Sequence, residues 1–353
     1  MTRNILITGV AGFIGSNFVY HYLDSHPDRT VIGYDNLTYA GNLDNLSAIP
    51  GSQRNRFIFI KGDICDQDRV EEVFQEYRIE GVINFAAESY VDRSIRDPRV
   101  FMRSNILGTG VLLDTALKFW QESSFSDEDT RFLQVSTDEV YGSLGPDGYF
   151  TEDTPLDPHN PYSASKASAD LLASAYHDTY RLPVIITRCS NNYGPYQFPE
   201  KLVPLVITKA LDHQPIPVYG DGRQVRDWLY VQDHCIAVDL TYERGGIGEI
   251  YNIGGNNELE NLDLIRLVLS ELSRETGDFE INENLIRHVA DRPGHDRRYA
   301  IDSGKIRRVL GWNAATRFDE GIKKTIRWYL ENKTWLQRVA SGNTGETSEW
   351  PYN

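Results

Sequence analysis

Short apolar runs alternate with amphipathic stretches along the first half of the chain. The apolar runs fall at residues 4–8, 30–34, 57–61, 81–85, 132–136 and 184–187. Helical periodicity separates them, at residues 13–23, 68–77, 106–121 and 163–180. Near-continuous apolar strands are typical of a parallel sheet covered on both faces, and strand–helix alternation favours right-handed βαβ units. The sequence therefore predicts an α/β fold with a Rossmann-like, doubly wound parallel sheet.

The pattern changes after Asn191, where five prolines lie between positions 195 and 217. We expect a dinucleotide-binding domain over residues 1–190, which also receives a segment near 228–253, and a smaller C-terminal α/β substrate domain over residues 191–353. The tail 341–353 is rich in small and polar residues, so we expect it to be mobile.

The charge balance limits the kinds of partner. A formal charge of −15 over 353 residues argues against nucleic acid or an anionic membrane, so an anionic ligand needs a local group of cations. No apolar run approaches the ~20 residues that span a bilayer, which favours a cytoplasmic protein. The three cysteines and the histidines lack metal-ligand spacing, so we expect reduced thiols and no metal.

A glycine triplet, Gly9, Gly12 and Gly15, lies where the first predicted strand meets the first predicted helix. In that context the spacing lets backbone amides approach a pyrophosphate at a helix N-terminus. Asp35 ends the second strand, 20 residues after Gly15, where a carboxylate accepts hydrogen bonds from ribose hydroxyls and repels a 2′-phosphate. We therefore expect NAD as the cofactor. Weaker signals follow the third and fourth strands, at Asp63-Ile64 and Ala86-Ala87.

Tyr162 and Lys166 lie four residues apart on a predicted helix, and Thr137, Asp138 and Glu139 follow a predicted strand. On one helical face Tyr162 and Lys166 reach the same place, and the lysine cation is expected to lower the phenol pKa so that Tyr162 acts as a base. Adjacent carboxyl groups suit the removal of water by an acid and a base. In a sequence without the glycine triplet, Tyr162 and Lys166 would be read as an ordinary helix surface, and Asp138 and Glu139 as a capped turn after a strand.

Several sequence blocks resemble the extended short-chain dehydrogenase/reductases that act on nucleotide sugars, and within them the dTDP-glucose 4,6-dehydratase family. The resemblance covers roughly residues 3 to 330. The blocks that carry it lie at residues 8–15, 86–94, 136–142, 188–196, 199–202, 218–222, 226–228 and 292–299. Tyr90 departs from the family pattern, where histidine is usual, and Ser104-Asn105 replaces a more frequent Thr-Asn.

The resemblance implies residue roles. Tyr162 would take the proton of the glucose 4-hydroxyl, Thr137 would hold that hydroxyl, Glu139 would remove the C5 proton and Asp138 would protonate the departing 6-hydroxyl, with Lys166 supporting Tyr162. Implied cofactor contacts are Gly9, Gly12, Phe13, Ile14, Gly15, Asp35, Asn36, Leu37, Thr38, Asp63, Ile64, Ala86, Ala87, Ser104, Tyr162, Lys166 and Asn192. Implied substrate contacts are Ser89, Thr137, Asn191, Glu200, Lys201, Leu202, Pro217, Tyr219, Arg226, Asn261, Arg292 and His295.

The resemblance further implies an NAD-dependent hydro-lyase acting on dTDP-glucose and a homodimer formed through helices near 104–120 and 162–180. Apolar residues on those helices are Leu107, Val111, Leu112, Leu171 and Leu172, although the chain's own sheet could also cover them. Other readings stay open at this point. They are a UDP-glucose 4,6-dehydratase, a 4-epimerase, a decarboxylase, or a catalytically silent NAD-binding protein.

Overall fold

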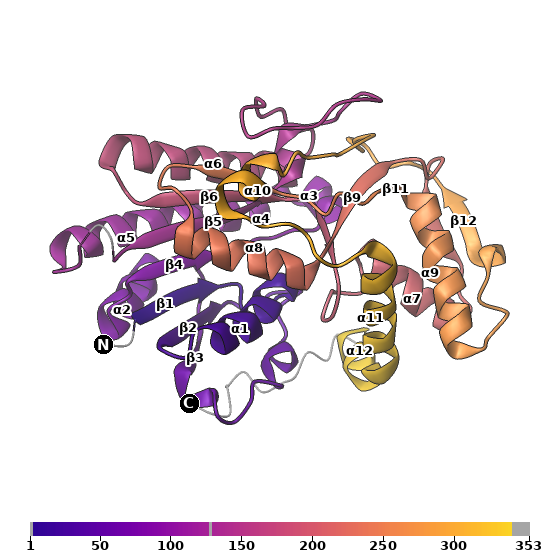
Figure 1. Cartoon of the computed structure of the whole chain (residues 1–353), viewed down its shortest axis with the longest axis horizontal. Coiled ribbons are helices and arrows are strands. Elements are labelled where there is room, and N and C mark those ends of the chain that lie inside the picture. The colour runs from indigo at the N-terminus through magenta and orange to yellow at the C-terminus, as the bar shows by residue number, and fades with distance from the viewer. Residues whose placement is uncertain (1–2, 127–128, 341–353) are drawn as a thin grey trace.

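A seven-stranded parallel sheet forms the centre of the larger lobe in the computed structural model, which describes residues 3–126 and 129–340 (Figure 1). The strand order is β10-β6-β5-β4-β1-β2-β3, so the chain winds outward in both directions from β1. The predicted Rossmann-like fold class is confirmed. The expectation for the tail 341–353 concerns residues outside the described part of the chain.

The sheet strands are β1 (Arg3–Thr8), β2 (Arg29–Asp35), β3 (Phe57–Lys61), β4 (Gly81–Asn84), β5 (Arg131–Thr137), β6 (Val184–Cys189) and β10 (Ile250–Ile253). Helices of this lobe are α1 (Phe13–Ser25), α2 (Gln67–Tyr77), α3 (Val91–Arg96), α4 (Pro98–Phe101), α5 (Thr109–Glu122), α6 (Pro161–Tyr180), α8 (Val231–Arg244) and α10 (Gly304–Leu310). Short turns are η1 (Leu43–Leu46), η2 (Arg54–Arg56), η3 (Met102–Gly108) and η4 (Asp138–Tyr141).

Two apolar layers cover the sheet. On one face, α1 and α8 pack on the strands through residues such as Phe18, Tyr22 and Val238, all fully buried. On the other face, α2, α5 and α6 pack through residues such as Phe74 and Leu112. Because both faces are covered, the strands can be apolar along their whole length, which explains the runs seen in the sequence.

The smaller lobe has its own apolar core, centred on Tyr193, Trp228 and Ile326. It lies on the right in Figure 1, beside the ends of the sheet strands. Its strands are β7 (Asn191–Tyr193), β8 (Ile216–Tyr219), β9 (Val225–Tyr230), β11 (Glu258–Glu260) and β12 (Ile286–Val289). Its helices are α7 (Leu202–Leu211), α9 (Asn261–Thr276), α11 (Phe318–Glu331) and α12 (Lys333–Ala340), with the turn η5 (Glu283–Leu285).

The helix expected over residues 106–121 begins differently from the prediction. The chain is already helical before it, and Met102–Gly108 forms a π-helical segment that leads directly into α5. The buried Asn105 in this segment exchanges two hydrogen bonds with the backbone of Glu88, at 2.8 and 3.0 Å. Wider π-helical turns often occur at functional sites. Here the turn brings Asn105 to the loop that follows β4, which periodicity alone does not reveal.

Candidate active site

The glycine-rich turn between β1 and α1 forms the first wall of the site. Gly9 has a φ of +70° and leaves no space for a side chain, because a Cβ there would lie 2.7 Å from the Ala86 nitrogen. A Cβ on Gly15 would collide with the Gly9 carbonyl. Gly12 precedes α1, whose first turn carries no acidic residue and no side-chain cap. This open helix N-terminus with close backbone approach fits the pyrophosphate of a dinucleotide.

Asp35 occupies the end of β2 as expected. Its two carboxylate oxygens accept hydrogen bonds from the Ala11 N–H, at 2.9 Å, and the Leu37 N–H, at 2.8 Å. Burial raises the pKa of Asp35, and the two N–H donors oppose that rise. Each oxygen keeps a lone pair for a further donor, so the carboxylate can accept both hydroxyls of a ribose.

A cavity of about 1630 Å³, including its open mouth, runs from this turn to the carboxyl ends of β4, β5 and β6. All five predicted catalytic residues line it, as do all predicted cofactor contacts except Leu37, which packs against the core under α1. Among the predicted substrate contacts, the lining includes Ser89, Thr137, Asn191, Glu200 and Lys201. The others lie outside the lining: Leu202, Pro217, Tyr219, Arg226, Asn261, Arg292 and His295.

Tyr162 and Lys166 project from the first turns of α6, a helix that begins with a capping box formed by Asn160 and Ser163. The Thr137 side chain opposes the rise of the Tyr162 phenol pKa, and the Lys166 ammonium donates to the Val135 carbonyl at 2.7 Å. The predicted lowering of the phenol pKa is wrong for the protein without ligands. Burial raises the pKa of Tyr162 well above its usual range, and nearby Glu139 raises it further. Burial also lowers the pKa of Lys166.

Asp138 and Glu139 have different environments. Asp138 is 1% exposed, and burial followed by the charge of Glu139 raises its pKa well above the usual range. Its Oδ1 lies 3.3 Å from the Thr137 hydroxyl, while its buried Oδ2 has no partner among the described residues. Burial raises the pKa of Glu139 too, but Arg292, Arg226 and Lys201 oppose the rise. Asp138 is therefore suited to donate a proton and Glu139 to accept one.

The same three cations define an anion site facing Glu139. The Arg226 guanidinium stacks on the Tyr299 ring, 4.1 Å from its centroid, and donates to the Asp296 carbonyl at 2.9 Å. Lys201 immediately precedes α7 and donates to the Ser89 carbonyl at 2.6 Å. Its ammonium also lies 5.5 Å above the ring of Tyr90, the residue that departs from the family pattern. Three cations of the smaller lobe can thus meet a diphosphate.

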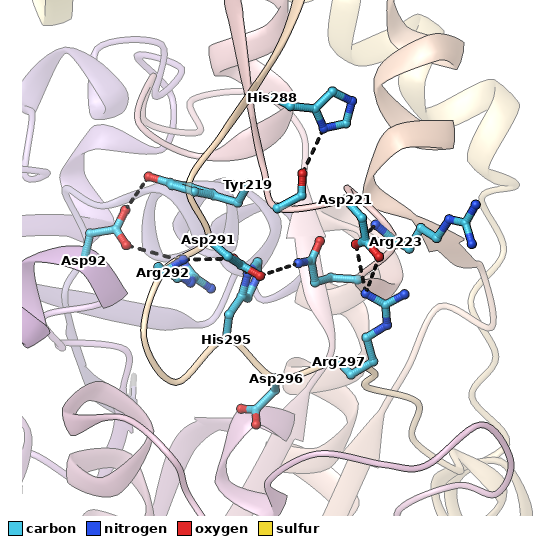
Figure 2. Close-up of polar contacts among 12 residues, drawn as sticks. Asp92, Tyr219, Asp221, Arg223, His288, Asp291, Arg292, His295, Asp296 and Arg297 are labelled. Atoms are coloured by element: carbon cyan, nitrogen blue, oxygen red, sulfur yellow. Dashed lines mark hydrogen bonds and ion pairs between the residues drawn. The ribbon is translucent and has the colours of Figure 1, made fainter.

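Figure 2 shows Arg292, from the loop after β12, beside Asp92, Asp291 and His295. Asp92 of α3 lies 3.6 Å from the Arg292 guanidinium and accepts a hydrogen bond from the Tyr219 hydroxyl at 3.2 Å. His295 contacts Asp291 at 2.6 Å on the same loop. Tyr219, Arg292 and His295 therefore lie together, although they do not line the cavity itself.

Four predicted site residues carry a buried polar atom without a hydrogen-bond partner among residues 3–126 and 129–340. These are Asp138 Oδ2, Asn191 Oδ1, Asn261 Oδ1 and Arg292 Nε. Buried polar groups in native proteins are nearly always paired, so such atoms call for a ligand or ordered water. Of the four, Asp138 and Asn191 line the cavity, one from each lobe, and their free oxygens fit a polar ligand there.

Among the cavity-lining residues that sequence reasoning missed, Tyr39 and Glu88 contact the predicted site residue Glu200 or its neighbours most directly. The Tyr39 hydroxyl donates to Glu200 at 3.0 Å, and the Arg93 guanidinium lies 4.7 Å above the Tyr39 ring. Arg93 also pairs with Glu88 at 3.1 Å. Glu88 falls inside a block quoted for the family resemblance and could have been selected there. Tyr39 lies outside those blocks, and no local pattern signals that it faces Glu200.

The expectation of no metal stays a prediction. His26, Asp239 and Glu243 bring possible ligand atoms within 4.8 Å of one another. Asp239 and Glu243 lie four residues apart on α8, but His26 is more than 200 positions away, so the sequence spacing did not reveal the group. The two carboxylates already have partners in the described structure. Asp239 pairs with His26 and with His21 at 2.8 Å each, and Glu243 pairs with Arg29 at 3.3 Å. These pairs account for the cluster by themselves.

Comparisons with known proteins agree with this geometry. The family model described as GDP-mannose 4,6 dehydratase matches residues 6–325. The dTDP-glucose 4,6-dehydratase of Xanthomonas campestris pv. campestris is 51% identical over 341 residues, which are 96% of each chain.

Solved structures agree as well. The dTDP-glucose 4,6-dehydratase of Streptomyces venezuelae, solved with NAD and TDP, has a TM-score of 0.88 at 45% identity, over 95% of this chain and 99% of that one. That of Bacillus anthracis, in complex with NAD, has a TM-score of 0.85 at 45% identity, over 96% and 99%. The sequence, the fold and the arrangement of the cavity agree, and this chain belongs to the dTDP-glucose 4,6-dehydratase family.

Proposed function

We propose that this chain is an NAD-dependent hydro-lyase that converts dTDP-glucose to dTDP-4-keto-6-deoxyglucose and water. One observation carries the proposal. A buried carboxyl with a strongly raised pKa, Asp138, adjoins Glu139, whose charge is supported by three cations, and both line one cavity with Tyr162 and the glycine-rich turn. An epimerase or a decarboxylase would need Tyr162 and Lys166 but not this pair.

The residues that line the cavity fit NAD. The pyrophosphate fits at the turn formed by Gly9, Gly12 and Gly15, and the adenosine ribose fits at Asp35. Asp63 and Ile64 line the same cavity. NAD, when bound, supplies the acceptor for the hydride of C4 and returns that hydride to C6. An Asp at position 35 disfavours NADP, because its carboxylate would repel a 2′-phosphate.

The chain's own groups handle the protons. Tyr162 Oη takes the proton of the 4-hydroxyl, which the Thr137 Oγ1 orients by hydrogen bonding. Once C4 is a ketone the C5 hydrogen becomes acidic, and Glu139 removes it. Asp138 then gives its proton to the 6-hydroxyl, which leaves as water, and Glu139 returns its proton to C5 when C6 receives the hydride. Tyr162 releases the proton it gained and Asp138 regains one from solvent, which resets both groups. Because burial raises the phenol pKa, removal of the 4-hydroxyl proton requires that Tyr162 has first lost its own proton to solvent, and Lys166, one helical turn away on α6, would supply a cation to that phenolate.

Separate incubations with dTDP-glucose, UDP-glucose and GDP-mannose test the proposal, with products weighed by mass spectrometry. Loss of one water from dTDP-glucose is the expected result. Deuterium placed at C4 of the sugar should reappear at C6 of the same molecule, because the cofactor carries the hydride within one turnover. Unchanged mass with inverted C4 would instead identify an epimerase, and turnover of no sugar would identify a silent binder.

A homodimer through α5 and α6 and a cytoplasmic location complete the proposal. Leu107 and Leu171 are 63% and 61% exposed, which supports an apolar contact with a second copy. Leu112 is instead fully buried under the chain's own sheet, and Val111 and Leu172 pack partly against the same core. None of the helices in the described ranges is long and apolar enough to cross a membrane.

We also keep the division into domains as a proposal, with a boundary near residue 190 and the segment 228–253 returning to the first domain. Two observations support it. The strand β10 pairs with β6 at the edge of the large sheet, and α8 packs in the core of that sheet. Residues of β7, α7, α9 and α11 form the separate second core.

A further inference from the structure

The last described helix, α12, links the smaller lobe to the neighbourhood of the glycine-rich turn. Its Trp335 is 8% exposed, and the indole N–H donates to Asn45 Oδ1 at 2.8 Å across 290 positions of sequence. One turn further along, Arg338 pairs with Asp44 at 3.0 Å. Both contacts end on η1, the short turn that follows the loop after β2.

Asn45 connects this helix to the turn itself. Its side-chain amide donates to the Ala11 carbonyl at 2.8 Å, and the backbone N–H of Asn42 donates to the same carbonyl at 3.0 Å. Ala11 lies between Gly9 and Gly12. On its other side, the Ala11 N–H donates to Asp35 at 2.9 Å. A continuous chain of hydrogen bonds therefore runs from Trp335 to the carboxylate that the adenosine ribose is expected to meet.

The indole of Trp335 decides which groups donate and which accept in this series of hydrogen bonds. Tryptophan has one N–H donor and no acceptor, whereas an asparagine amide offers an acceptor at one end and donors at the other. Trp335 therefore holds the Asn45 oxygen toward itself, which leaves the Asn45 nitrogen facing Ala11. Without that N–H the Asn45 oxygen has no donor to hold it, so the amide can turn away from Ala11 and its nitrogen is no longer kept against the Ala11 carbonyl.

A cluster of aromatic rings packs around Trp335 and holds its side chain in place. Its ring lies 5.0 Å from that of Trp328, 6.0 Å from Tyr196 and 6.2 Å from Tyr329, in edge arrangements that aromatic rings prefer. The glycine-rich turn is packed through the side chains of Val10 and Ala11, but its three glycines add no side chain to that packing. Its conformation depends on backbone hydrogen bonds, and the Ala11 carbonyl carries two of them.

We propose that Trp335 is a positioning residue for the dinucleotide, which acts through Asn45 to hold the glycine-rich turn in its binding conformation. The inference deepens the proposed function and rests on it, because it assumes that this turn binds NAD. It makes the smaller lobe part of the cofactor site. Tight holding matters in this reaction, since a cofactor lost after the first hydride transfer would leave the sugar stranded as the ketone.

The test compares Trp335→Phe with Trp328→Phe in the full chain. The first variant keeps an aromatic ring in the cluster and removes only the N–H that reaches Asn45. The second removes an indole from the same cluster, and that indole makes no hydrogen bond within the described residues. We expect the dissociation constant of NAD, measured by titration of cofactor-stripped protein, to rise about three- to tenfold in Trp335→Phe. In Trp328→Phe it should stay at the wild-type value.

Two further measurements separate positioning from simple stabilisation. The dissociation constant of dTDP should not change in Trp335→Phe, because that ligand does not meet the turn. Asn45→Ala should weaken NAD at least as much, and adding Trp335→Phe to it should cause no further loss, since both changes break one link.

A melting temperature that falls without any change in NAD affinity would show that Trp335 is merely structural, and would overturn the inference. Equal weakening in both tryptophan variants would also overturn it, because the N–H would then not matter. Failure of the wild-type chain to bind NAD would be a different result, since it would remove the proposed function first.

Discussion

Replacing Glu139 by glutamine separates the two halves of the proposed reaction. The amide keeps the shape of the side chain and removes its ability to accept a proton. Tyr162, Thr137 and Lys166 are unchanged, so oxidation at C4 should proceed. Elimination should stop, because the hydrogen on C5 then has no positioned acceptor.

The size of the effect follows from the environment of Glu139. Burial raises its pKa, while Arg292, Arg226 and Lys201 oppose the rise and keep the ionised form accessible. Loss of a positioned base costs about 10²–10⁴ in rate, or about 2.7–5.4 kcal/mol of barrier. In the wild type, activity should rise as the pH passes upward through the raised pKa of Glu139, because only the carboxylate is a base. The glutamine variant should lose that limb of the profile.

Two signals in deuterated water make the assay specific. Reduction of bound NAD, followed by absorbance, reports oxidation at C4, and entry of deuterium at C5 reports the base. Glu139→Gln should reduce NAD without exchanging C5. Asp138→Asn is the matched control, since it leaves the base in place; it should exchange C5 and lose water slowly. Exchange at C5 in Glu139→Gln at the wild-type rate would refute the assignment of the base.

Three further changes test other parts of the structure. Gly15→Ala should lower the unfolding free energy by about 1–3 kcal/mol and release NAD, because the new Cβ meets the Gly9 carbonyl; denaturant unfolding and cofactor content measure both. Asp35→Asn should weaken NAD about tenfold and reduce discrimination against NADP, as titration with each cofactor would show. The hydrogen bond to Asp239 raises the pKa of His26 above 6.5, so its stabilisation is complete below pH 6.5 and is lost as the pH rises through the raised value. His26→Gln should therefore melt with a flatter pH dependence across that window, and parallel curves would contradict the pairing.

The elements of the larger lobe could be predicted because their signals are local. A strand buried on both faces is apolar throughout, and the six predicted strands match β1 to β6 to within two residues at each end. The start of α5 could not be predicted in the same way. Its π-helical approach depends on Asn105 bonding to Glu88 across the fold, which is a tertiary contact without periodicity.

In the candidate site, too, features set by local sequence could be predicted, whereas features set by tertiary contacts could not. Spacing near a strand end predicted Gly9, Gly15 and Asp35 as site residues, and the structure brings all three to one cavity. The direction of the Tyr162 pKa was wrong because it depends on burial in the folded protein, which a sequence motif does not measure. The link from Trp335 to Asn45 was likewise out of reach, since it joins opposite ends of the chain.

The path of the backbone limits how this cavity can open. After β6 the chain enters the smaller lobe, returns through α8 and β10 to the large sheet, and leaves again for β11 and α9. Several connections therefore tie the two walls together, and a wide hinge motion would have to strain all of them at once. Any opening of the cavity between the lobes therefore has to bend several connections together, at the ends of β6, β9, β10 and β12, rather than a single linker.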